Sequence, residues 1–181
     1  MNRLFFVAAL ALATSLTQAQ MITVDSELRP NIDFSHYKSY VWASQLDNKL
    51  DPANSLILKK QVQDAVGYAL DGRGYTFVSQ SPDLLVNFQV FDKPTTIKGY
   101  VGADATYVTP GEGPGLNSDK DISVNAGTIL VNLVDTRTDQ VVWQGLASGL
   151  TSSNGFDRQK GRVREAVNLI FNKYPYRADK F

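Results

Sequence analysis

The pattern of apolar and polar positions is clearest between residues 127 and 150. Two β-branched, apolar runs flank the short polar segment Thr136–Asp139, which is typical of two antiparallel strands joined by a turn. The side chains of the first run alternate between two faces, with Ile129, Val131 and Leu133 on one and Leu130, Asn132 and Val134 on the other. Both faces are largely apolar, which predicts a central strand of a sheet that is covered on both sides.

Two segments have the spacing of amphipathic helices. The first begins at Asp51 and Pro52, which suit the cap and the first turn, and it ends at Gly72. The second runs from about Phe156 to Lys173. Their apolar stripes are Leu58, Val62, Ala65, Val66, Ala69 and Leu70 in the first, and Val163, Ala166, Val167, Ile170, Phe171 and Tyr174 in the second.

Further strands are expected at residues 22–27, at the edge of the sheet, and at 39–44, 75–78 and 84–91. In the last of these, one side is wholly apolar and should meet the helices. The order strand, strand, helix, strand, strand, loop, strand, strand, helix predicts an α+β fold. We expect a mostly antiparallel sheet of about five to six strands with two helices packed on one face.

Residues 92–124 break the pattern, with five glycines and three prolines. A loop of this length in a compact domain is usually functional or mobile. Its Tyr100 and Tyr107 admit two readings. They are either recognition aromatics at an interface, or they fold back over the second face of the sheet.

The first nineteen residues have the features of a secretory signal peptide. Arg3 precedes the apolar run Leu4–Leu16, and Ala19 offers a small residue at the cleavage site. The run is shorter than the roughly 20 apolar residues of a spanning helix, so no transmembrane anchor is expected. We predict cleavage before Gln20, leaving residues 20–181 as a single domain.

The composition of the chain excludes several kinds of binding site and catalytic site. Removing Arg3 from the 18 Lys and Arg leaves 17 against 18 Asp and Glu, which argues against nucleic-acid binding because that needs a basic face. The chain has one histidine and no cysteine, so zinc sites of Cys and His and cysteine nucleophiles are excluded. Asp33, Ser35 and His36 are best interpreted as a capped turn. No cofactor, metal or catalytic residue is predicted.

Four cations, Arg158, Lys160, Arg162 and Arg164, cluster in the first turns of the last expected helix. Positive charge there opposes the helix dipole at about 0.3–1 kcal/mol each. The cluster is either a binding surface for an anionic partner or a solvated face, and the second interpretation is favoured.

Three stretches of the sequence are similar to a known family. They are residues 33–42, residues 81–88 and residues 127–145, and the last of these ends with Val142, Trp143, Gln144 and Gly145. Together they resemble the bacterial domain of unknown function 4136. The resemblance implies an exported protein, often a lipoprotein, and it implies no catalytic residue. This chain lacks the lipid-bearing cysteine, so it is expected to be periplasmic or secreted and not lipid-anchored.

The leading hypothesis is an exported, non-enzymatic cell-envelope protein that binds an unknown envelope protein or component. The alternative is a carrier of an apolar ligand or lipid, held between the sheet and the loop at 92–124. A third hypothesis is a hydrolase that uses two converging carboxylates.

Overall fold

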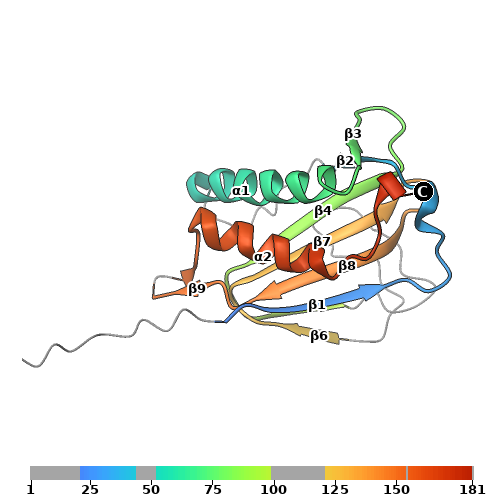
Figure 1. The fold of residues 1–181 in the computed structure, drawn as a ribbon. Coiled ribbons are helices and arrows are strands. Elements are labelled where there is room, and N and C mark those ends of the chain that lie inside the picture. The colour runs from blue at the N-terminus through green and yellow to red at the C-terminus, as the bar shows by residue number, and fades with distance from the viewer. Residues whose placement is uncertain (1–20, 44–51, 99–120, 154, 181) are drawn as a thin grey trace, which may run out of the picture.

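The computed structural model describes residues 21–43, 52–98, 121–153 and 155–180. Six strands form the main sheet in the order β1-β8-β7-β4-β2-β3 (Figure 1). Their bounds are β1 (Thr23–Leu28), β2 (Ser39–Trp42), β3 (Thr76–Phe77), β4 (Leu84–Phe91), β7 (Thr128–Asp135) and β8 (Gln140–Ser148). The predicted central strand, β7, lies inside the sheet, and β1 lies at an edge as expected.

The sheet is mixed. Strands β1, β8, β7 and β4 pair antiparallel, whereas β2 pairs parallel with both β4 and β3. The parallel pair β2 and β3 flanks helix α1 (Pro52–Asp71) in the chain, and parallel neighbours need such a crossover connection. The α+β prediction is confirmed, with a parallel part added to the antiparallel sheet.

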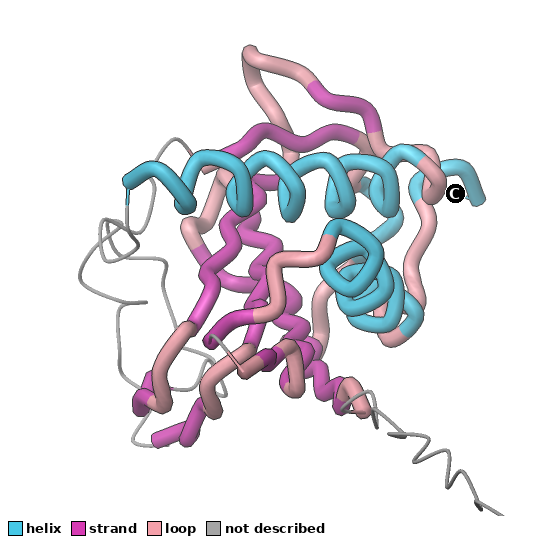
Figure 2. The backbone as a smooth tube through the Cα atoms, turned by 90° about the vertical axis from the view of Figure 1, so that its left-hand side faces the viewer, coloured by secondary structure: helices cyan, strands magenta, loops and turns pink. Residues whose placement is uncertain are grey.

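Both helices lie on one face of the main sheet, α1 beside α2 (Lys160–Asn172), as Figures 1 and 2 show from two sides. The predicted apolar stripes of both helices are buried in the core. Helix α2 begins at Lys160 and not near Phe156. The reason is that Gly155–Phe156 (β10) pairs with Thr151–Ser152 (β9), and the ring of Phe156 enters the core.

Trp143 on β8 forms the centre of the contact between the sheet and α2. Its side chain is only 1% exposed, and its ring centroid lies 5.4 Å from that of Phe171 and 4.9 Å from that of Tyr174. A Cβ atom at Gly145 would lie 2.5 Å from Cγ2 of Ile170. Glycine at this position therefore lets α2 approach the sheet closely.

The C-terminal ends of both helices meet at Arg73. Its guanidinium donates to the carbonyl of Ala69 in α1 at 3.1 Å and to the carbonyl of Phe171 in α2. A cation at the C-terminus of a helix is favourable because the last carbonyls are unpaired and carry partial negative charge. Two short 3-10 helices, η1 (Phe34–His36) and η2 (Ala178–Lys180), complete this end of the molecule.

The segment 92–124 differs from the expected uninterrupted loop at its two ends. Residues Thr95–Lys98 (β5) pair antiparallel with Asp121–Val124 (β6) as a separate two-stranded sheet. These short runs contain Thr, Ile and Val, whose branched side chains favour strands. The predicted signal peptide at 1–19 and the aromatics Tyr100 and Tyr107 lie outside the described residues.

Candidate functional site

Four polar side chains stand directly opposite one another on neighbouring strands of the main sheet. Asn87 of β4 pairs in register with Asn132 of β7, Asn132 with Gln144 of β8, and Gln144 with Glu27 of β1. Side chains at directly opposite positions have Cβ atoms about 4.5–5.5 Å apart. These residues, named here the polar row, therefore cross four strands as one continuous line.

The polar row lies on the face of the sheet away from the helices. Its chain neighbours Val86, Val131, Leu133 and Trp143 belong to the core that packs against α1 and α2. Because side chains alternate along a strand, the row must point to the opposite side. Figure 2 shows that both α1 and α2 lie on the other face.

Gln144 is the most unusual member of the polar row. Its side chain is 2% exposed, and neither Oε1 nor Nε2 has a hydrogen-bond partner among the described residues. Asn132 beside it is 1% exposed. A buried amide without partners costs about 1–3 kcal/mol of stability. Gln144 therefore offers one donor group and one acceptor in a site closed to bulk water.

Apolar side chains flank the row on the same face. Leu130 and Val134 of β7 lie two residues to either side of Asn132, and both are buried. Val134 clusters with Val141 and Leu85. The second face thus combines a line of hydrogen-bonding groups with apolar surface. Three of the four members of the polar row are amides, which do not titrate near neutral pH, so they suit recognition by hydrogen bonds and not proton transfer.

A second polar cluster lies at the end of the sheet, around Asp135. Its carboxylate accepts hydrogen bonds from the hydroxyl of Tyr37 at 2.8 Å, from the backbone N–H of Arg137 at 2.8 Å, and from the Arg137 guanidinium at 3.3 Å. Burial opposes ionisation, but the hydrogen bonds outweigh it and lower the pKa of Asp135. Burial and the nearby carboxylate raise the pKa of Tyr37.

Asp83 has a similar role where β4 begins. Its carboxylate accepts from the backbone N–H groups of Lys38 and Ser39, both at 2.9 Å, and from the Ser39 hydroxyl at 2.7 Å. Burial opposes its ionisation too, but these bonds lower its pKa. Asp83 and Asp135 therefore fasten the segment from η1 to β2 onto β4 and β7.

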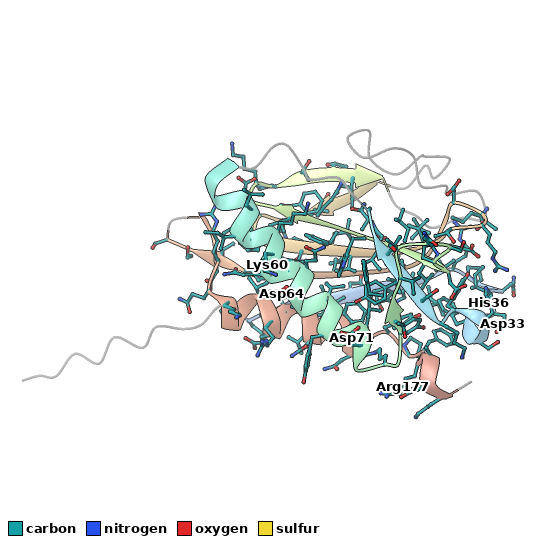
Figure 3. All side chains as sticks on the ribbon, turned by 90° about the horizontal axis from the view of Figure 1, so that it is seen from above. Asp33, His36, Lys60, Asp64, Asp71 and Arg177 are labelled. Carbon is teal, nitrogen blue, oxygen red and sulfur yellow. The ribbon has the colours of Figure 1, made fainter. Side chains whose placement is uncertain are left out.

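The predicted capped turn at Asp33 is confirmed. The Asp33 carboxylate accepts from the backbone N–H of Ser35 at 2.9 Å. His36 is exposed, and its ring Nε2 lies at hydrogen-bond distance from the Arg137 guanidinium. Figure 3 shows Asp33 and His36 together at this end of the molecule. The three residues thus form a local turn, with the carboxylate directed to the backbone.

The four cations predicted as a possible binding surface are not equivalent. Arg158, Lys160 and Arg164 are exposed. Arg162 is engaged instead, with Nη1 2.9 Å from Glu165 and Nε 3.7 Å from Asp157. One of the four charges is therefore largely compensated, and Arg158 precedes the first residue of α2.

The polar row is the part of the site that the sequence did not reveal. Asn87, Asn132 and Gln144 each interrupt a mainly apolar strand, whereas Glu27 lies in the more polar segment Thr23–Leu28. Taken alone, none of the four indicates a site. Only the register of four strands brings the members into line. A usable signal was present in Asn132, an amide on the strand that the sequence predicts to be covered on both faces.

Comparison with known proteins identifies a family and a fold. The family model described as Domain of unknown function (DUF4136) matches residues 24–176. The comparison with curated proteins found no match. No helix among the described residues is both long and apolar enough to cross a membrane.

Several solved structures are similar in fold. A PDZ domain protein from Parabacteroides distasonis matches with a TM-score of 0.53 and 18% identity, covering 87% of this chain and 36% of its own. This chain thus spans little more than a third of that protein. Two structures of the PelC dodecamer from Paraburkholderia phytofirmans match with a TM-score of 0.47 and 14% identity, covering 87% of this chain and 99% of theirs.

Proposed function

The chain belongs to the DUF4136 family, and from that premise we propose that it is an exported, non-enzymatic binding module of the cell envelope. We place its recognition site at the polar row, whose end members Asn87 and Glu27 are partly exposed and whose middle members Asn132 and Gln144 are buried. The signal-like residues 1–19 support export, and the absence of cysteine from the sequence supports a periplasmic or secreted protein without a lipid anchor.

The observation that carries this proposal is the buried carboxamide of Gln144. Both of its polar atoms lack hydrogen-bond partners among the described residues. A carboxamide donates and accepts at once, so it fits a neutral group with both capacities, such as an amide, a hydroxyl or a protonated carboxyl. Retaining such a group in a buried position lowers stability, and function is a common reason for that loss.

Two of the buried or partly buried carboxylates, Asp83 and Asp135, have a structural role that does not suit hydrolysis. A carboxylate hydrolase needs one carboxyl with a raised pKa to act as general acid. Asp83 and Asp135 instead have lowered pKa values, because each accepts several hydrogen bonds. Both carboxylates are engaged in hydrogen bonds that hold strands together.

A second candidate function is the carriage of an amphiphilic lipid. The buried side chains of Leu130, Val134 and Val141 lie on the same face as Gln144. An acyl chain would contact these side chains while its polar end hydrogen-bonds to the carboxamide. Native mass spectrometry of protein purified from its own cells separates the two candidates, since a carrier would retain a lipid mass.

Substitution of Gln144 by methionine tests the proposed site. Gln144→Met keeps the size of the side chain and removes both polar atoms, so capture of partners from an envelope extract should fall about 5- to 150-fold, for the loss of about 1–3 kcal/mol. The same change should raise the free energy of unfolding by about 1–3 kcal/mol, since a desolvated amide is removed.

The matched control is Gln159→Met, which changes an exposed glutamine in the same way. It should leave both capture and urea unfolding unchanged. If Gln144→Met destabilises the fold and leaves capture intact, the carboxamide is a structural group and the proposed site is wrong.

A further inference from the structure

Helix α1 has a side that faces away from the sheet and from α2. Its buried stripe from Leu58 to Leu70 packs into the core, whereas Ile57 and Tyr68 on the other side are 63% and 72% exposed. Single exposed apolar side chains are common on protein surfaces, so it is the placement of these two on one side of α1 that matters here. Tyrosine in particular is enriched where proteins associate.

Ile57, Lys60, Asp64 and Tyr68 are separated by three, four and four positions, so they share one side of the helix. These four residues are named here the outer stripe. Its apolar members stand at the two ends and its charged members in the middle. Lys60 and Asp64 form an exposed ion pair, with Nζ 3.0 Å from Oδ1. Figure 3, which looks onto α1 from above, labels both beside each other along the helix.

The order of residues in the outer stripe is self-complementary. Ile57 and Tyr68 are equally distant from the midpoint between residues 62 and 63, and Lys60 and Asp64 are equally distant from residue 62. The two centres differ by half a residue, about 0.75 Å along a helix. An antiparallel copy of the helix, related by a two-fold axis at the first centre, would place Ile57 against Tyr68 and Lys60 within about one residue of Asp64. Each contact would occur twice, as in any isologous interface.

We propose that this protein forms a two-fold homodimer in which α1 packs antiparallel against α1 of a second copy. Spacings of three and four residues allow side chains of one helix to fit between those of another at a shallow crossing angle. The stripe carries both signs of charge in an order that matches itself, which favours a second copy over a partner of uniform charge. A single helix pair buries little surface, so dissociation in the micromolar range is expected.

The experiment is analytical ultracentrifugation of the mature chain from about 1 to about 200 μM, a range that spans micromolar dissociation constants. The wild type should pass from monomer to dimer across this range. Tyr68→Glu places a charge on the stripe and should weaken the dimer at least about 10-fold. Asn168→Glu, which adds the same charge to an exposed position of α2, is the matched control and should leave the dimer unchanged.

Charge reversal gives an independent test. Lys60→Asp and Asp64→Lys should each weaken the dimer, because each places like charges opposite one another across the two-fold axis. The double variant restores opposite charges at every contact and should recover the wild-type dissociation constant. Circular dichroism checks that each variant keeps its helices. A wild type that stays monomeric throughout, or a dimer indifferent to Tyr68→Glu, overturns the proposal.

Discussion

The hydroxyl of Tyr37 donates a hydrogen bond of 2.8 Å to Oδ2 of Asp135, although 98 positions separate the two residues in the chain. The bond joins the residue directly after η1, near the start of the described chain, to the end of the central strand β7. Both side chains are buried. A hydrogen bond to a charged group contributes about 1.5–3 kcal/mol, so this contact is a substantial long-range tie in the fold.

The tie should make stability depend on acid pH. The pKa of Asp135 is lower in the folded protein than its ordinary value, so its contribution is present above about pH 4 and is lost as the pH falls through the folded pKa. Asp135→Asn should therefore lose about 1.5–3 kcal/mol at about pH 7 and clearly less at about pH 2.5. Urea unfolding at both pH values measures the difference.

The control for this pH dependence is Glu165→Gln, whose side chain is 52% exposed. It should change stability by less than about 1 kcal/mol at either pH, as exposed ion pairs usually do. An equal loss for Asp135→Asn at both pH values would show that its charge is not the source of the stabilisation.

Trp143→Ala should be among the most destabilising single changes in the protein. The ring fills the contact between β8 and α2, and its removal leaves a cavity, so a loss of about 3–5 kcal/mol is expected. Trp42→Ala, at a partly buried ring, should lose less. Equilibrium unfolding in urea compares them, and a loss below about 1 kcal/mol for Trp143→Ala would contradict a core role.

Gly145→Ala tests the close approach of α2 to the sheet. The added methyl group would meet the side chains of Ile170 and Trp143 at 2.5 and 2.6 Å, so overpacking should lower stability by about 1–3 kcal/mol. Gly161→Ala is the matched control, because a Cβ atom there meets nothing within 4 Å. In α2 it should stabilise by about 0.5–1 kcal/mol. Thermal unfolding of both variants measures these two changes in stability. A Gly145→Ala variant as stable as the wild type would refute the packing argument.

Export is tested by the mass of the protein recovered from a periplasmic extract. The features of residues 1–19 predict a chain that begins at Gln20. Intact-mass measurement distinguishes this chain from the full-length one. A mass that includes Met1 would contradict export by a cleaved signal peptide.

Local periodicity was enough to predict most of the elements. The buried stripes of α1 and α2 follow from helical spacing alone, because residues three and four apart share a side of any helix. The central place of β7 followed from apolar residues on both of its faces. The start of α2 could not be placed, because the pairing of β10 with β9 overrides a pattern that would also suit a helix.

The sequence by itself therefore determined most of the helices and longer strands and which of their sides are apolar, since these properties depend on neighbours along the chain. Only the tertiary structure decided the parallel pairing of β2 and the register across β4, β7, β8 and β1. Strand order and register depend on contacts between residues far apart in the chain, and single-residue patterns carry little information about them. The polar row belongs to this second class: Asn87, Asn132, Gln144 and Glu27 become one surface only when the four strands come into register.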